Sequence, residues 1–314
     1  MIKKTLYFGS PVFLSSKDNQ LVIEKRKDKS VPPQQTQDDL YSDMRRTIPI
    51  EDIGILVIDH YGVTITQYCL SQLIENNTGV IVCNDTHHPT GLFLPIDGNS
   101  IQSERFKKQI KASKPLLKQL WQQTVSAKIS NQARLLKIRG KKYANLLSWA
   151  EKVRSGDPDN FEARASVYYW KTLFHKDIDF QRDRFGEPPN NLLNYGYAVL
   201  RAIIARGLVS TGLIPTLGIH HRNKYNAYCL ADDIMEPYRP FVDRIVSSIA
   251  DEEVDLFGLD TQMKKKLLAI ATEDAVIGGS KSVLMAAVQK TTSSLYRCFE
   301  SSKNKLIYPS MPEE

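Results

Sequence analysis

The chain has 314 residues, of which 42% are hydrophobic, and its 42 basic side chains outnumber 35 acidic ones. This length suffices for two ordinary domains with packed cores. No N-terminal apolar segment resembles a signal peptide, and no uncharged run approaches about 18 residues. The four cysteines show no pairing motif, so we expect a cytoplasmic protein with reduced thiols and no membrane span.

The first hundred residues are predicted to form a small β-rich domain. Short runs rich in Val, Ile, Phe and Tyr, separated by turn residues, indicate strands. These runs cover residues 4–16, 20–26, 46–53, 54–60, 79–85 and 91–96. Residues 64–77 have helical spacing, and the polar segment 27–44 is predicted to be a long mobile loop. The turn-rich stretch 95–100 marks the predicted end of the domain.

Residues 101–302 are predicted to form a larger all-helical domain, and residues 303–314 a flexible tail. Within the segment 115–136, apolar residues four apart form one stripe along a helix. The stripe consists of Leu117, Trp121, Val125, Ile129 and Ala133. Further helices are expected over residues 161–174, 190–213, 238–250, 261–275 and 280–301. The predicted fold class is α+β, with a β-rich domain before an all-α domain.

The charge of the chain is concentrated in one segment. Residues 101–145 hold 12 basic side chains and one acidic side chain, Glu104, whereas the regions on either side each have a small excess of acid. Such a concentration favours a polyanionic partner. A solvated helix face that keeps the protein soluble gives the same composition, and the sequence leaves both readings open.

The stretch GIHHRNKYNAYCLADDIMEPYRP, residues 218–240, combines a histidine with two nearby carboxylates. If the second half is helical, Asp233 and Glu236 project side by side, and their mutual repulsion would be relieved by a divalent ion. His221 on the preceding loop could supply a nitrogen ligand. Arg239 could instead neutralise Glu236 as an ordinary helix ion pair. Two prolines beside the acidic pair indicate a bent helix or its end.

Glu162 is a candidate for a further ligand from a distant part of the chain. It lies in FEARASVYYW, at the start of a predicted helix. The spacing Asp159-x-x-Glu162 also fits a capping box, in which the glutamate only satisfies a backbone N–H. From the residues alone, the capping role is favoured and the ligand role stays open.

Four motifs in order resemble one family, the CRISPR-associated endonuclease/integrase that is the first protein of the spacer-acquisition module. Residues 218–240 are similar to its His, Asp, Leu/Ile-Met-Glu and Arg-Pro signature, and FEARASVYYW to its Glu-Gly/Ala-x-Ala segment. AKISNQARLL (127–136) and NNLLNYGYAVLRA (190–202) also match. The residue after Glu162 is alanine where many members have glycine. The short, β-then-helical form resembles members found with type II systems.

The resemblance implies a catalytic site and its chemistry. The implied metal ligands are Glu162, His221 and Glu236, and Asp233 belongs to the same catalytic set, either through water or by positioning His221. His220 is then a neighbour. Oxygen and imidazole ligands suit Mg²⁺ or Mn²⁺. The implied reaction is phosphoryl transfer at DNA, in which a 3′-OH end attacks a phosphodiester bond and a spacer is joined to the CRISPR array.

The same resemblance implies the partners. Double-stranded DNA would be bound through phosphate contacts, which are independent of sequence. The expected contact residues are Lys128, Arg134, Lys137, Arg139, Lys141 and Lys142. The family pattern implies a homodimer through the N-terminal domain, a 4:2 complex with a dimer of the small second adaptation protein, and contact with an RNA-guided effector nuclease. Two alternatives remain: a metal-dependent DNA repair nuclease, and a non-catalytic DNA-binding scaffold.

Overall fold

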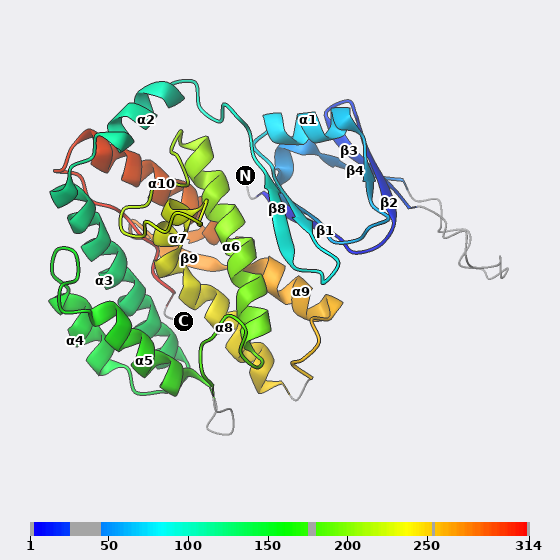
Figure 1. Cartoon of the computed structure of the whole chain (residues 1–314). Coiled ribbons are helices and arrows are strands. Elements are labelled where there is room, and N and C mark those ends of the chain that lie inside the picture. Colours follow the sequence, from blue (N-terminus) through cyan, green and yellow to red (C-terminus); the bar gives the residue numbers. More distant parts are fainter. Residues whose placement is uncertain (1–2, 26–44, 175–179, 253–254, 313–314) are drawn as a thin grey trace. The chain divides into compact units, whose positions relative to one another are not determined.

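The computed structural model describes residues 3–25, 45–174, 180–252 and 255–312, and the chain divides into two compact units, residues 1–96 and 97–314 (Figure 1). The predicted order, a β-rich region before a helical one, is confirmed. The division falls a few residues before the predicted boundary at residue 100. The segment 27–44, predicted as a mobile loop, lies outside the described residues.

The described residues of the first unit form two four-stranded sheets, one α-helix and a short 3₁₀ helix, Ile50–Asp52. One sheet has the order β1-β5-β7-β8, in which only β8 is antiparallel to its neighbour, and the other has the order β4-β3-β2-β6. Leu14, Leu21 and Leu56 lie in its apolar core with Leu73 of the helix. The elements are β1 (Lys4–Phe8), β2 (Val12–Lys17), β3 (Gln20–Lys25), β4 (Arg46–Pro49), β5 (Ile53–Ile58), β6 (Thr64–Ile65), α1 (Gln67–Glu75), β7 (Gly79–Cys83) and β8 (Pro89–Phe93).

The second unit is built on long helices. Its helices are α2 (Gln102–Ile110), α3 (Lys114–Ile138), α4 (Ala144–Lys152), α5 (Phe161–Leu173), α6 (Asn190–Ser210), α7 (Cys229–Met235), α8 (Arg239–Asp251), α9 (Thr261–Leu268) and α10 (Leu284–Glu300). The predicted stripe on α3 is confirmed, because Trp121, Val125, Ile129 and Ala133 are buried and Leu117 is half-buried. α3 packs against α4, α5 and α8 (Figure 1).

Helix α6 is the apolar core helix of this unit. By length and composition it could cross a membrane, but 78% of its most apolar window is buried inside the protein. A helix that is apolar on all sides is typical of a buried core position. Its apolarity is therefore used in packing against the other helices.

A β-hairpin interrupts the region predicted to be helical. Strand β9 (Asp274–Ile277) pairs antiparallel with β10 (Ser280–Val283), so the predicted helical character of residues 274–275 and 280–283 is wrong. The connecting residues Gly278 and Gly279 have φ angles of 60° and 76°. Glycine reaches this left-handed region without a Cβ penalty, and a Gly-Gly pair is a strong two-residue hairpin signal.

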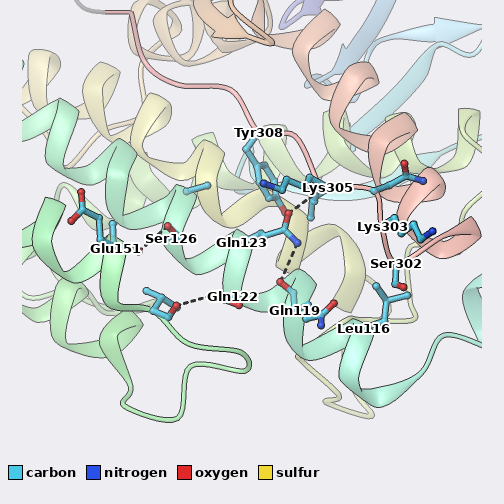
Figure 2. Close-up of a pocket in the computed structure, with 15 residues that line it drawn as sticks. Leu116, Gln119, Gln122, Gln123, Ser126, Glu151, Ser302, Lys303, Lys305 and Tyr308 are labelled. Carbon is cyan, nitrogen blue, oxygen red and sulfur yellow. Dashed lines mark hydrogen bonds between the residues drawn. The ribbon is translucent and has the colours of Figure 1, made fainter.

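The C-terminal segment is packed rather than flexible, which corrects the prediction for the tail over its described residues 303–312. Leu306 and Met311 are buried, and Ser310 forms a β-bridge with Val276. Gln123 of α3 accepts the backbone N–H of Leu306 at 3.0 Å. Figure 2 shows Tyr308 and Lys305 above α3, beside a cavity of about 690 Å³. Apolar residues of the segment thus complete the helical core.

Candidate metal centre

Glu162 is held in the first turn of α5 by an N-terminal cap. The carboxylate of Asp157 accepts the backbone N–H groups of Phe161 at 3.0 Å and of Glu162 at 2.9 Å. The predicted capping box with Asp159 is therefore wrong, because Asp159 pairs with Arg154 at 2.8 Å. With the cap supplied by Asp157, the Glu162 carboxylate is available to other partners.

His221 and Asp233 are brought together by a tight turn. The Asp233 carboxylate is fully buried; it accepts a hydrogen bond from Nδ1 of His221 and the backbone N–H of His220 at 2.8 Å. A Cβ at Gly218 would lie 2.3 Å from the carbonyl oxygen of His221, so this close approach requires glycine. The hydrogen bond that His221 donates to Asp233 raises the pKa of His221, against the opposite effect of burial.

Glu236 lies where the chain bends between α7 and α8. A short 3₁₀ turn, Glu236–Tyr238, separates the two helices, in agreement with the predicted bend near the prolines. Nε of Arg239 donates to Oε1 of Glu236 at 2.8 Å, so the alternative helix ion pair is present. Burial raises the pKa of Glu236, but Arg239 and Lys128 outweigh this effect and lower that pKa to about 2. Glu236 is therefore an ionised, buried carboxylate.

Lys128 of α3 joins the two glutamates. Its Nζ lies 2.7 Å from Oε2 of Glu236 and contacts Oε1 of Glu162. Burial lowers the pKa of Lys128, but the charges of Glu236 and Glu162 outweigh it and raise the pKa, so the side chain is an ammonium. Residues that are far apart in the sequence thus converge on one cation.

The side chains at this point are of the types that bind a divalent ion, two carboxylates and an imidazole. Among the described residues, no group of three or more His, Cys, Asp or Glu side chains is arranged as a metal cluster. Two carboxylates nevertheless share one cation, the Lys128 ammonium. Within the described parts of the chain, Oε2 of the buried Glu236 receives no hydrogen bond of normal geometry. Glu162, Glu236 and the imidazole of His221, oriented by Asp233, are the residues that could hold Mg²⁺ or Mn²⁺.

Trp121 also belongs to this centre, although the sequence predicts it only as a core residue of the apolar stripe. Its indole, 4% exposed, stacks on His220 with ring centroids 4.0 Å apart and an interplanar angle of 4°. It also meets the ring of His221 edge-on at 5.6 Å. Burial lowers the pKa of His220, and His221 adds to this effect. No local sequence pattern marks this contact, because Trp121 and the double histidine are far apart in the sequence.

A second group of residues that the sequence did not predict, Tyr197, Asp243 and Tyr169, supports the side chain of Arg239. The guanidinium of Arg239 lies 4.5 Å above the ring of Tyr197, whose hydroxyl donates to the buried carboxylate of Asp243. Tyr169 of α5 donates to the same carboxylate at 2.7 Å. These contacts fix Arg239, and through it Glu236. The sequence spacing of these residues contains no signal for the arrangement.

The predicted DNA-contact residues do not form one surface. Lys128 is buried at the metal centre, and Nη2 of Arg139 donates to both carboxylate oxygens of Asp251 at 2.7 and 2.8 Å. Lys137 and Lys142 are exposed, and Arg134 and Lys141 are half-buried. Part of the basic segment is therefore used inside the protein.

A cavity lies beside His221. A cavity of about 390 Å³ is lined by His221 together with Arg222, Asn223 and Lys224 from the same loop. The cavity in Figure 2 is lined by other residues and contains none of the predicted ligands. Of these two cavities, the one beside His221 contains a predicted ligand.

Comparison with known proteins places the fold and the family. Residues 6–277 match the family described as CRISPR associated protein Cas1. A CRISPR-associated endonuclease Cas1 of Neisseria meningitidis serogroup C (strain 8013) is 36% identical over 250 residues, which are 79% of this chain and 81% of the relative. Among solved structures, a casposase bound to integration product superposes with a TM-score of 0.72 at 19% identity, covering 98% of this chain and 92% of that one. The chain of a Cas6-RT-Cas1–Cas2 complex gives 0.70 at 19% identity, covering 96% and 35%. The match over most of the chain shows that this protein belongs to the Cas1 family of CRISPR-associated proteins.

Proposed function

We propose that this chain is a metal-dependent DNA endonuclease and integrase that joins short DNA fragments to a CRISPR array. The observation that carries the proposal is the convergence of Glu162 and Glu236 on one cation, beside a histidine anchored by Asp233. The Neisseria relative is named an endonuclease, and the casposase of similar fold was solved bound to an integration product. Both agree with this chemistry.

Each residue has a role that follows from its contacts. Glu162, Glu236 and His221 would hold the ion; Asp233 keeps the imidazole in one orientation, and Arg239 holds Glu236 ionised. A bound Mg²⁺ or Mn²⁺ supplies polarisation of the phosphodiester and stabilises charge on the leaving oxygen. With the 3′-OH of a fragment as nucleophile the outcome is strand transfer, and with water it is cleavage.

DNA is proposed to bind through phosphate contacts around this centre. Arg222 and Lys224 line the cavity that contains His221, and Lys137 and Lys142 are exposed in the basic segment. Contacts to phosphates are independent of base sequence, which suits a protein that must accept fragments of any sequence.

The proposed assembly is a homodimer that acts with Cas2. A chain of similar fold occurs in a solved Cas6-RT-Cas1–Cas2 complex, which supports a Cas2 partner for this chain. We propose the N-terminal β-rich unit as the homodimer interface and a 4:2 stoichiometry. An RNA-guided effector nuclease is a further proposed partner.

The test is a joining assay. A labelled short duplex with free 3′-OH ends is incubated with a supercoiled plasmid that carries a leader and a repeat, in Mn²⁺ or Mg²⁺, with the partner protein present. Metal-dependent joining by the wild type, lost in Glu162→Gln and His221→Ala, is expected. Asp274→Asn, which removes an exposed carboxylate on β9, is the control and should join normally.

Other outcomes identify the alternative functions. Nicking without joining in the same assay would indicate a repair nuclease. Equal DNA binding by all four proteins, with neither nicking nor joining, would indicate a scaffold in which Lys128 and Arg239 neutralise a structural pair of glutamates.

A further inference from the structure

Lys128 belongs by sequence to the basic segment, but its ammonium lies inside the candidate metal centre. Its side chain is 9% exposed, and Nζ contacts Glu162 and lies 2.7 Å from Oε2 of Glu236. The lysine therefore stands at the point where the two carboxylates would coordinate an ion.

An ammonium and a divalent ion cannot share this point. Carboxylate oxygens bind Mg²⁺ at about 2.0–2.1 Å, so an ion held by both glutamates would lie between the two carboxylates that Lys128 now joins. Two cations this close repel strongly in a buried site. Binding of the metal thus requires that Nζ moves away from Glu162 and Glu236.

The Lys128 side chain is flexible enough to move, and its charge stabilises the site in the absence of metal. Lysine carries a compact charge on a flexible four-carbon stem with several rotatable bonds, unlike the planar fork of arginine. Before metal binds, its charge offsets the repulsion between two carboxylates, one of them buried on all sides. After the ion has taken the carboxylates, a DNA phosphate bound at the same centre would be a new anionic partner for the ammonium.

We propose that Lys128 is an internal cation of this site. Before metal binds, it holds Glu162 and Glu236 together. The divalent ion then displaces it, and the ammonium pairs with the DNA phosphate. This inference rests on the proposed function, because it takes the two glutamates to be metal ligands. It predicts that the lysine competes with metal but supports catalysis.

Metal binding to the full chain without DNA tests the competition. If the lysine leaves the site about one-tenth of the time, the apparent dissociation constant is about ten times the intrinsic one. Titration calorimetry with Mn²⁺ should therefore give about tenfold tighter binding for Lys128→Met than for the wild type. Without metal, Lys128→Met should melt at a lower temperature, and saturating Mn²⁺ should remove most of that difference. Lys118→Met, which changes an exposed lysine on the same helix, should alter neither quantity.

The charge-conserving variant separates competition from misfolding. Lys128→Arg keeps the cation and should bind Mn²⁺ no more tightly than the wild type. Equal Mn²⁺ affinity of Lys128→Met and wild type would overturn the competition. At saturating Mn²⁺, strand transfer by Lys128→Met should fall at least about tenfold, since a contact to a charged group is lost; unchanged strand transfer would overturn the phosphate contact.

Failure of this inference is distinguishable from failure of the proposed function. If Glu162→Gln removes Mn²⁺ binding while Lys128→Met leaves it unchanged, the metal site stands and only the role of Lys128 is wrong. If Glu162→Gln binds Mn²⁺ as the wild type does, the ligand assignment itself is wrong.

Discussion

The carboxylate of Asp233 contacts both the side chain and the backbone of His221. Its Oδ1 accepts a hydrogen bond from Nδ1 of the imidazole, and both of its oxygens lie 3.3 Å from the backbone nitrogen of His221. A third contact comes from the backbone N–H of His220 at 2.8 Å. With its oxygens used in this way and its carboxylate fully buried, Asp233 is placed to orient the imidazole rather than to bind a metal ion directly.

Asp233→Asn should weaken metal binding while keeping the fold. An amide offers one acceptor where the carboxylate offers two, so the orientation of His221 is held less firmly. Loss of such a supporting contact costs roughly 10–100-fold in metal affinity. The measurement is the Mn²⁺ dissociation constant by titration calorimetry. Asp232→Asn is the matched control, because Asp232 is the adjacent residue of α7 but pairs with Arg201 at 2.6 Å. Equal affinity in the two variants would show that Asp233 has no special part in the site.

Replacement of Trp121 should disturb the loop that carries His220 and His221. Trp121→Phe keeps a flat ring beneath His220, whereas Trp121→Leu keeps apolar volume but removes the ring. Aromatic pairs contribute about 0.5–1.5 kcal/mol beyond their buried area. We therefore expect weaker Mn²⁺ binding in Trp121→Leu than in Trp121→Phe, at similar melting temperatures. If both variants melt at a lower temperature than the wild type but bind Mn²⁺ with unchanged affinity, Trp121 acts only as a core residue.

Several parts of this structure are predictable because their signals are local. The apolar stripe of α3 follows from residues four apart, and the bend at Glu236–Tyr238 follows from the prolines beside it. Gly278-Gly279 also carries a hairpin signal, but helices are predicted up to residue 275 and from residue 280, and over residues 274–275 and 280–283 that prediction is wrong. Signals of this kind depend on neighbours along the chain.

The centre of the site is less predictable because its contacts are distant in sequence. Lys128 resembles a surface lysine in its sequence context, yet it is buried because α5 and the α7–α8 bend bring carboxylates to it. Asp157 rather than Asp159 caps α5, because Asp159 is paired with Arg154, and the local spacing does not distinguish the two. The C-terminal segment is ordered by α3 and β9, partners that no local pattern reveals.

The basic segment should act on DNA through its exposed lysines. Charge reversal in the double variant Lys137→Glu/Lys142→Glu should weaken binding to duplex DNA of any sequence. It should also reduce the magnitude of the slope of log affinity against log salt by about 2, because each phosphate contact contributes about one unit. The measurement is fluorescence anisotropy over a salt series. Lys281→Glu, on β10 outside the segment, should leave the slope unchanged.

Charge reversal at Arg139 should mainly affect stability. It is paired with Asp251, and its side chain is 17% exposed, so Arg139→Glu places two carboxylates together. We expect a lower melting temperature with a small change in salt slope. A large loss of slope at constant melting temperature would mean that Arg139 contacts DNA after all.

Asp243 should make stability depend on pH between about 4 and 6. Burial raises the pKa of this carboxyl to about 6, although the hydroxyls of Tyr197 and Tyr169 and the charges of Arg239 and Arg182 act in the opposite direction. A carboxyl with a raised pKa holds its proton more tightly in the folded state. Its stabilising contribution is complete below about pH 4 and is lost as pH rises through 6, a change on the order of 3 kcal/mol.

Urea denaturation of wild type and Asp243→Asn between pH 4 and 8 measures this effect. The amide does not titrate, so the wild type should lose stability relative to the variant from pH 4 to about 6.5, and the difference should then stay constant. The comparison with the variant cancels the other carboxyls, including Glu236, whose lowered pKa acts at more acidic pH and with the opposite sign. A difference that is flat over the whole range would mean that Asp243 is ionised throughout, held so by Arg239 and Arg182.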